Sequence, residues 1–225
     1  MKWISKFCFF FATVCFLVAF FLMCIDLNSF NPTFFKKEYV KLNTAEEIGM
    51  SQDDLDKATT TLLDYIQAKR DDLNVVATID GIETEVFNEK EKLHMIDVRV
   101  LYLNAMQVKW VSGILGMILL VIGIALNRRE AARSFFDMAS KALLATFSIL
   151  FLIGLYAVVD FNSFWLQFHY IFFTNDLFLL NPATDILIKM VPSQFFFDLV
   201  FRIVISFALG IAIFASACVY ERRRR

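Results

Sequence analysis

The stretch 4–25 reads ISKFCFFFATVCFLVAFFLMCI, with a single lysine as its only charged residue. An α-helix rises about 1.5 Å per residue, so an apolar run of this length spans the roughly 30 Å hydrocarbon core of a bilayer. Three further runs have a similar character, at 110–126, 142–159 and 195–220. The pattern predicts an all-α membrane protein with four transmembrane helices, the first within 1–25.

The overall composition agrees with a membrane protein. The 225 residues are 58% hydrophobic and include 27 phenylalanines, and the mean hydropathy is +0.59. A soluble domain is typically about 45–50% apolar. The net charge is −1, and no basic patch lies outside the predicted cytoplasmic ends, so we expect no nucleic-acid partner.

The distribution of charge predicts the orientation. The N-terminal flank, the loop 127–141 and the tail 221–225 together hold ten basic and three acidic residues. Because lysine and arginine concentrate in cytoplasmic loops, these segments and both termini are predicted to be cytoplasmic. Region 26–109 carries 16 acidic and 10 basic residues, and it is predicted to face outward together with 160–194.

The first run also has the basic start of a secretory signal peptide. Its apolar run is longer than the usual 7–15 residues and lacks an A-x-A site, which favours a retained helix. The stretch 21–24 faintly resembles a lipobox, but Met23 is a poor fit before a cysteine. All four cysteines lie within predicted spans, so we expect them to pack as small apolar residues rather than form disulfides.

Residues 26–109 are expected to form a small extracytoplasmic α+β domain. A serine N-cap followed by apolar residues at helical spacing predicts an amphipathic helix over 52–70. Two β-prone runs flank Asp80-Gly81, which predicts a hairpin over 75–87. The apolar face of the helix either contacts the membrane surface or a lipidated partner, or packs on the rest of the domain. The second interpretation is favoured.

The segment 160–194 is too rich in aromatic residues for a solvated loop and suits the headgroup layer, so it is predicted to be an outer interfacial segment. Within it, Asn181-Pro182 predicts the start of a short helix that runs to Met190. A further helix leads into the second span, and either a capping box at 88–91 or Asp97 starts it.

The chain has only two histidines, His94 and His169, and both are predicted near the same outer surface. Histidine both accepts and donates protons near neutral pH, because its unperturbed pKa is about 6.5. Asp97 would share a helix face with His94, three residues away, and could orient the imidazole or simply cap a helix. Arg99 would pair with an acidic residue or a lipid phosphate, or lie solvated at the surface.

The sequence argues against two other chemistries. The histidines with Asp97, Asp176 or Asp185 would be enough ligands for zinc, but no H-E-x-x-H or comparable spacing exists, so no metal is expected. A G-x-S-x-G nucleophile elbow is also absent, and the cysteines lie within spans. If the protein is an enzyme, its nucleophile would come from the substrate, and no cofactor is expected.

Several short motifs resemble a known family. They are LHMIDVR at 93–99, FHYIFFTND at 168–176, NPATD at 181–185, and Pro192 shortly before the last span. Together with the order of the spans, they make the chain similar to the lipoprotein intramolecular transacylase (Lit) family of four-helix bacterial membrane proteins. The resemblance covers essentially the whole chain.

The resemblance implies an activity and a location. Such enzymes act on bacterial lipoproteins whose N-terminal cysteine carries an S-diacylglyceryl group. They move one acyl chain to the α-amino group of that cysteine, which gives the lyso-form, N-acyl-S-monoacylglyceryl-cysteine. The implied partners are these lipoproteins and the lipid bilayer, in a multi-pass protein of the bacterial cell membrane whose active site faces the outer leaflet. The family's two histidines are matched by His94 and His169.

The residues suggest a mechanism for this reaction. His169 would act as general base for the amine, and His94, oriented by Asp97, would protonate the leaving glyceryl oxygen or stabilise the oxyanion. On the sequence alone the two roles are interchangeable. Asn175 could donate to the oxyanion, and Asp176 or Asp185 could hold the tautomer of His169 or, equally, cap helices. The supporting residues are therefore Asp97, Arg99, Asn175, Asp176 and Asp185.

Two other functions are compatible with the sequence. In one, the protein is a non-catalytic membrane module whose acidic outer domain binds a partner and whose histidines sense pH. In the other, it is an acyl-transfer enzyme that acts on phospholipid without a lipoprotein. A monomer is expected for the transacylase.

Overall fold

The computed structural model describes residues 2–223, with side chains described as far as residue 220. The chain divides into two compact units. Unit 1 comprises 1–27, 105–160 and 201–225, and unit 2 comprises 28–104 and 161–200.

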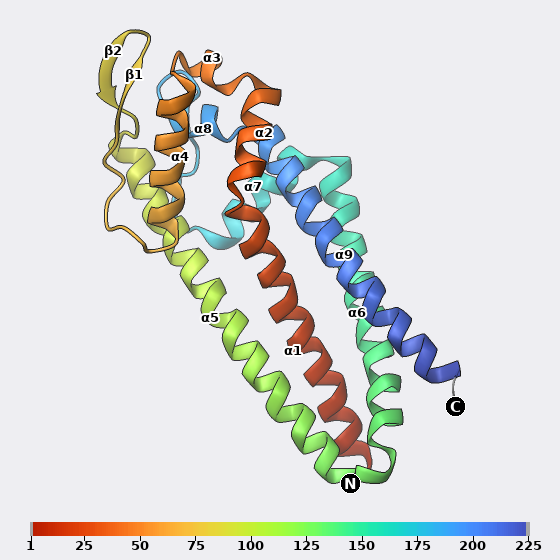
Figure 1. The fold of residues 1–225 in the computed structure, drawn as a ribbon. Helices are drawn as coiled ribbons and strands as arrows, with labels where there is room; N and C mark the ends of the chain where they lie inside the picture. The colour runs from red at the N-terminus through yellow and green to blue at the C-terminus, as the bar shows by residue number, and fades with distance from the viewer. Residues whose placement is uncertain (1, 224–225) are drawn as a thin grey trace. The chain divides into compact units, whose positions relative to one another are not determined.

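Unit 1 is built from long apolar helices (Figure 1). In the part of the chain that the structure describes, four helices are long and apolar enough to cross a membrane, as the sequence predicts. These are α1 (Lys2–Ser29), α5 (Glu89–Leu126), α6 (Ala131–Val159) and α9 (Ser193–Arg223). A short 3-10 turn, η1 (Arg128–Glu130), joins α5 to α6.

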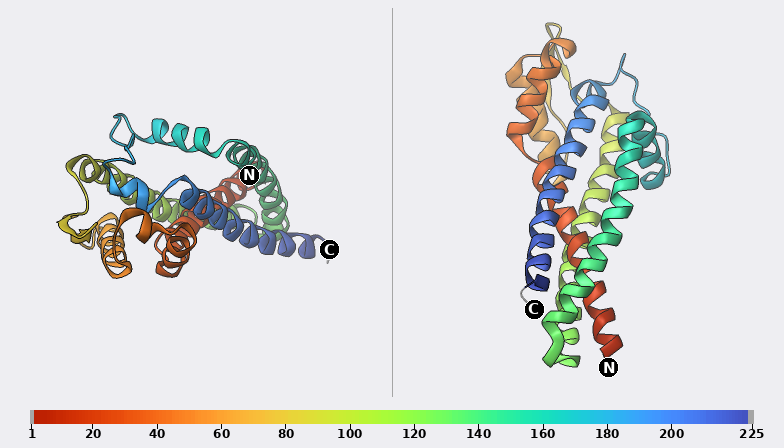
Figure 2. Two further views of the ribbon diagram at one scale, coloured as in Figure 1. Left: turned by 90° about the horizontal axis from the view of Figure 1, so that it is seen from above. Right: turned by 90° about the vertical axis from the view of Figure 1, so that its right-hand side faces the viewer.

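Close contacts between phenylalanine rings and glycines pack the helices of unit 1, which run side by side in Figure 1 and in the right-hand view of Figure 2. A Cβ atom on Gly123 of α5 would lie 2.7 Å from the ring of Phe9 in α1. A Cβ atom on Gly210 of α9 would lie 2.2 Å from the ring of Phe20, which is also in α1. Such small residues let apolar helices approach closely where lipid provides no hydrophobic driving force.

The loop expected over 127–141 is much shorter in the structure. Helix α6 begins at Ala131, because no proline or glycine interrupts 131–141 and good helix formers dominate its first turn. Lys2, at the start of α1, forms an ion pair of 3.3 Å with Glu130 in this connection. The tail expected over 221–225 continues α9 as far as residue 223, and residues 224 and 225 lie outside the described residues.

Unit 2 combines short helices and one hairpin with the first parts of the long helices α5 and α9 (Figure 1). The amphipathic helix expected over 52–70 is α4, which ends at Ile66, two residues before Ala68 adopts a left-handed φ of 57°. Its apolar face is buried, as the packing interpretation expects, with Leu55, Ala58 and Leu62 among its buried residues. The elements within unit 2 are α2 (Pro32–Leu42), α3 (Thr44–Ile48), α4 (Gln52–Ile66), β1 (Val76–Ile79), β2 (Ile82–Glu85), α7 (Phe161–Phe172) and α8 (Ile186–Met190).

The hairpin β1–β2 turns at the Asp-Gly dipeptide that predicts it. Asp80 has a φ of 51° and Gly81 a φ of 82°. Positive φ at both central residues is the geometry that a two-residue hairpin turn requires, and Asp-Gly favours it. The strands pair antiparallel, with Val76 opposite Glu85. Every residue of β2 is exposed, so only the face of β1 with Ala77 contributes to the core.

An Asn-Pro dipeptide starts a helix at 31–32 but not at 181–182. Asn31 caps α2, and its side chain accepts the backbone N–H of Phe34 at 3.1 Å. The helix expected over 182–190 is wrong in its first turn, because α8 begins only at Ile186. Here Asn181 Oδ1 accepts the Ala183 N–H and Asp185 Oδ2 accepts the Asn181 N–H, which closes a side-chain turn in place of a helix.

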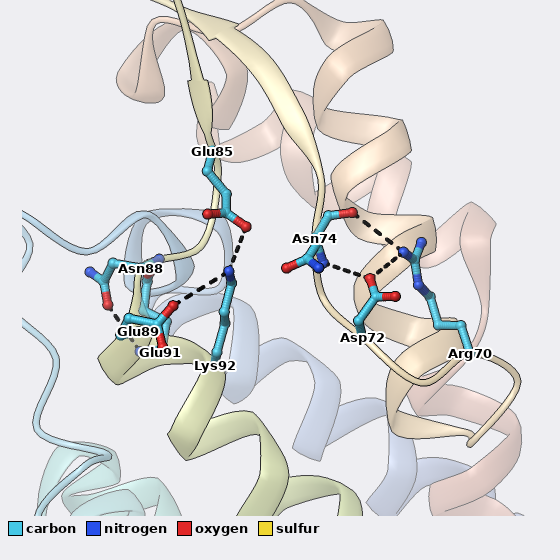
Figure 3. Close-up of polar contacts among 8 residues, drawn as sticks. All are labelled: Arg70, Asp72, Asn74, Glu85, Asn88, Glu89, Glu91 and Lys92. Atoms are coloured by element: carbon cyan, nitrogen blue, oxygen red, sulfur yellow. Dashed lines mark hydrogen bonds and ion pairs between the residues drawn. The ribbon is translucent and has the colours of Figure 1, made fainter.

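The start of α5 decides between the two expected caps. Asn88 Oδ1 accepts the Glu91 N–H at 3.0 Å, and Glu91 Oε2 accepts the Asn88 N–H at 2.7 Å. This reciprocal pair is a capping box, shown with its neighbours in Figure 3. Asp97 lies two turns inside the helix and does not cap it.

Candidate functional site

The two histidines lie side by side in unit 2. His94 is in the first part of α5 and His169 is in α7. Their ring centroids are 6.1 Å apart, and the ring planes are inclined by 32°. This separation is short enough for one ester group beside the pair to contact both imidazoles.

Aromatic side chains surround the pair. Phe173 packs edge-on against His94 at 5.3 Å and lies 5.6 Å from His169. Phe178 lies 4.9 Å from His169, and Trp165 packs edge-on against the same ring at 5.0 Å. Phe173 and Phe178 are buried. These rings replace water around the imidazoles, which strengthens electrostatic interactions and disfavours charge on the rings.

A backbone carbonyl fixes the tautomer of His169. The Nδ1 atom lies 2.7 Å from the carbonyl oxygen of Trp165, one turn earlier in α7. A carbonyl only accepts hydrogen bonds, so Nδ1 carries the proton and Nε2 of the neutral ring keeps a free lone pair. Burial lowers the pKa of His169, and the bond to Trp165 opposes this shift. His169 is therefore neutral at pH 7 and basic at Nε2.

His94 lies in the charged half of α5 that precedes the apolar run 110–126. The 38 residues of α5 extend about 57 Å, nearly twice the thickness of a hydrocarbon core, so this half lies outside the spanning segment. Burial lowers the pKa of His94 to about 4, and the neighbouring charges of His169 and Lys90 act in the same direction while that of Asp97 opposes them. His94 is therefore also neutral at pH 7.

The Nδ1 atom of His94 is buried and has no hydrogen-bond partner among the described residues. Asp97, expected to orient this imidazole, instead accepts a hydrogen bond from Asn175 Nδ2 at 2.9 Å. Asp97 therefore acts on His94 through its charge. A buried N–H without a partner is rarer than an unsatisfied acceptor, which favours the tautomer with a bare Nδ1 and a proton on Nε2.

The other predicted residues are distributed over unit 2. Asp185 is buried and accepts hydrogen bonds from Asn88, Asn181 and Thr184, with no contact to His169. The expectation that a carboxylate holds the tautomer of His169 is therefore wrong for Asp185, because the Trp165 carbonyl has that place. Burial raises the pKa of Asp185, but these hydrogen bonds outweigh it and hold the pKa below its ordinary value.

Asp176 and Arg99 also lie away from the histidine rings. Asp176 is exposed, and its backbone carbonyl accepts the Leu179 N–H. Arg99 packs over the ring of Tyr65 at 4.7 Å and donates to the carbonyl oxygen of Arg70 at 3.1 Å. Its role in the structure is to attach the loop after α4 to α5. Of the predicted residues, the structure brings together His94, His169, Asp97 and Asn175.

Sequence reasoning did not identify Glu91 as a site residue. It is fully buried, and its Oε1 accepts the backbone N–H of Leu187 at 2.5 Å. The capping-box spacing predicts its contact with Asn88, but nothing in the local sequence predicts the contact with α8. Among the described residues, no group of three or more His, Cys, Asp and Glu side chains could hold a metal ion.

Four candidate spans define a class of protein, a membrane protein, and it has two imidazoles close together among aromatic side chains. Comparison with known proteins gives the family. The family named lipoprotein intramolecular transacylase Lit matches residues 10–196. The chain therefore belongs to the Lit family, as the motifs predict. It is a membrane acyltransferase that acts on lipoproteins.

Solved structures agree with the fold. The membrane integral lipoprotein intramolecular transacylase Lit from Bacillus cereus matches with a TM-score of 0.75 and 17% identity, over 98% of each chain. A histidine-to-arginine variant of that protein gives a TM-score of 0.72 at 17% identity, over 98% of this chain and 94% of the other. A histidine-to-alanine variant gives 0.74 at 15%, over 98% and 95%. No curated protein sequence matches the chain.

Proposed function

We propose that the protein moves an acyl chain from the S-diacylglyceryl group of a bacterial lipoprotein to the α-amino group of its N-terminal cysteine, with His94 and His169 as the catalytic residues. The observation that carries the proposal is the pair of imidazoles with ring centroids 6.1 Å apart, in which Nδ1 of His169 is bound to a backbone carbonyl and Nδ1 of His94 has no partner among the described residues. One ring offers a lone pair at Nε2, and the other offers an N–H at Nε2. A single ester group between them would meet a base and a donor at once.

The base is His169. The amine nitrogen attacks the ester carbonyl carbon, and its N–H becomes acidic as the new C–N bond forms. His169 Nε2 accepts this proton, while the Trp165 carbonyl holds the ring and stabilises the imidazolium through Nδ1–H. When the C–O bond of the ester breaks, the same proton passes to the glyceryl oxygen. The products are an amide and a free hydroxyl, and the enzyme returns to its starting state.

The donor is His94. A neutral imidazole stabilises a developing oxyanion through its N–H, and a lowered pKa keeps it neutral at pH 7. The structure supports this role over proton delivery to the leaving oxygen, since a ring with a pKa of about 4 holds no extra proton to give. Asn175 is bound to Asp97, so it supports the site through that carboxylate.

The substrate supplies the remaining chemistry. The amine and the ester belong to one molecule, so holding it between the rings makes the step unimolecular, which is worth orders of magnitude in rate. The aromatic side chains exclude water, which would otherwise hydrolyse the ester. No cofactor or metal enters this scheme. Both imidazoles come from one chain, so a monomer contains the complete site.

The location completes the proposal. The excess of basic residues supports cytoplasmic termini, and the acidic region 26–109 supports a site at the outer leaflet, where the acyl chains and amine of a lipoprotein lie.

Mass spectrometry of lipoprotein N-termini from bacteria that express the chain tests this function. We expect lyso-form termini with the wild type and unmodified diacylglyceryl termini with His94→Ala or His169→Ala. The exposed Gln167, on the same helix as His169, provides the control variant Gln167→Ala, which should retain the product. Diacylglyceryl termini with the wild type would refute the transacylase proposal, and acyl transfer on phospholipid alone would support the other enzyme hypothesis.

A further inference from the structure

The segment 175–187, which we call the strap, joins α7 to α8 and is attached to α5 at both of its ends. At its first residue, Asn175 Nδ2 donates to Asp97 at 2.9 Å. At its last residue, the N–H of Leu187 donates to Glu91 Oε1 at 2.5 Å. Glu91, His94 and Asp97 follow one another at intervals of three, so they share one face of α5. The two attachments therefore bracket His94.

Further contacts attach the strap near the Glu91 end. Asn88 Nδ2 donates to Asp185 Oδ1 at 2.9 Å, and Lys90 Nζ donates to the carbonyl of Leu179. Leu187 is itself buried, so this end of the strap is anchored by packing as well as by hydrogen bonds. This end of the strap is therefore held at the start of α5.

The strap matters to the histidines because it carries part of their aromatic surroundings. Phe178, in the strap, lies 4.9 Å from His169 and is buried. Phe173, two residues before the strap, touches both rings. A displacement of the strap from α5 would move these phenylalanines and open the histidine pair to water.

Glu91 uses both of its carboxylate oxygens in this attachment. Oε2 accepts the N–H of Asn88, which caps α5, and Oε1 accepts the N–H of Leu187, in the first turn of α8. The side chain is fully buried between these two N–H groups. The neighbouring Glu89 and Lys92 take no part in this attachment. Lys92 instead forms ion pairs with Glu85 of β2 and with the exposed Glu89 (Figure 3).

We propose that Glu91 is a positioning residue, which holds the strap against α5 and thereby keeps His94 and His169 together in their apolar surroundings. Its effect on turnover rests on the proposed function, whereas its effect on the geometry of the two rings does not.

The chemistry of the side chain explains why a carboxylate is needed. Two backbone N–H groups approach from two helix starts, and only a carboxylate offers an acceptor to each. Glutamine keeps one acceptor and turns an N–H₂ group toward the second N–H, which breaks that contact. Burial raises the pKa of Glu91, the N–H groups of Leu187 and Asn88 oppose this shift, and the charge of Asp185 adds to it.

The test compares Glu91→Gln with Glu89→Gln in the full-length protein in detergent micelles. Glu89 is two residues away, its side chain is 88% exposed, and its only contact among those described is the 3.7 Å pair with Lys92. Because the chain has only two histidines, selective ¹⁵N labelling of histidine resolves each imidazole and gives its pKa by NMR titration. The other charged groups that act on His94 are His169, Asp97 and Lys90, and both variants retain them.

We expect Glu91→Gln to raise the pKa of His94 from about 4 toward its ordinary value by about one unit or more, because water reaches the ring. We also expect it to lower kcat by about 10- to 100-fold with KM changed by less than about threefold. The reason is that misplaced catalytic side chains slow the reaction of bound substrate without weakening substrate binding. Glu89→Gln should leave both quantities unchanged. Asp185→Asn loosens the same end of the strap and should give a smaller shift in the same direction if Glu91→Gln does not fold.

A folded Glu91→Gln protein with the wild-type titration of His94 would overturn the proposal, whatever its kcat. A shifted titration in a protein whose wild type makes no lyso-form product would uphold the positioning role of Glu91 and refute the proposed function instead.

Discussion

Protonation of His94 should destabilise the folded protein, and the size of the effect follows from its burial. The pKa of this ring is about 4 in the folded state against about 6.5 in the unfolded chain. Between these values the unfolded state binds more protons, so the free energy of unfolding falls as the pH falls. The contribution of His94 is complete above about pH 6.5 and is lost by about pH 4. A difference of about 2.5 pKa units corresponds to about 3 kcal/mol at 1.36 kcal/mol per unit.

His94→Phe isolates this contribution. Phenylalanine keeps a ring against Phe173 but does not titrate, so the variant lacks the pH dependence that His94 adds. The assay is the free energy of unfolding in detergent micelles, measured by SDS titration with tryptophan fluorescence at pH values from 7 to 4. Carboxylates such as Asp185 also titrate in this range, and they cancel in the difference between wild type and variant.

We expect the wild type to lose about 3 kcal/mol more than His94→Phe between pH 7 and pH 4. Equal slopes for the two proteins would refute the reasoning, because they would show that His94 is as easily protonated in the folded state as in the unfolded chain. The neutral donor role given to this ring would then fail as well.

Three further predictions concern stability and topology. Asp185→Asn should lower the free energy of unfolding by about 1.5–3 kcal/mol, since it weakens the buried carboxylate that Asn88, Asn181 and Thr184 bind; chemical unfolding measures this. Gly210→Ala should destabilise the bundle by about 1–3 kcal/mol, because its Cβ would lie 2.2 Å from an α1 phenylalanine ring. Gly154 has open space around it, so the control variant Gly154→Ala should not destabilise the protein. An unchanged melting temperature for Gly210→Ala would contradict the packing. A cysteine at exposed Glu47 should react with an impermeant maleimide in intact cells and one at exposed Arg129 only after lysis, and the reverse order would invert the topology.

The spans, the hairpin and the helix α4 could be predicted from the sequence, because each depends on local rules. Apolar length decides the spans, and Asp80-Gly81 decides the turn. The helix α7 is missing from the prediction, although the aromatic residues at 161, 164, 165, 168 and 172 follow helical spacing, because the density of aromatic residues indicates the headgroup layer and not a type of secondary structure. For the same reason the bond from His169 to the Trp165 carbonyl could not be foreseen, since it exists only where that segment is helical.

The candidate site shows the same limit. The pairing of His94 with His169 followed from their predicted location on one surface, and the structure places the rings together. The hydrogen-bond partners of the Asp97 and Glu91 carboxylates could not be predicted from the sequence. Asp97 binds Asn175 and Glu91 binds Leu187, and both contacts join residues that are 78 and 96 positions apart. A single sequence contains no signal for such contacts, because they depend on how the strap folds back on α5.

The central claim is that the two imidazoles act as one unit on a single ester. Its most direct test is the rate of acyl transfer in vesicles with purified diacylglyceryl lipoprotein, measured for His94→Ala, His169→Ala and the double variant. Residues that act together are non-additive, so the double variant should be no slower than the slower single variant, each having lost about 10²–10⁴-fold. Losses that multiply in the double variant, or a single variant with the wild-type rate, would contradict the claim.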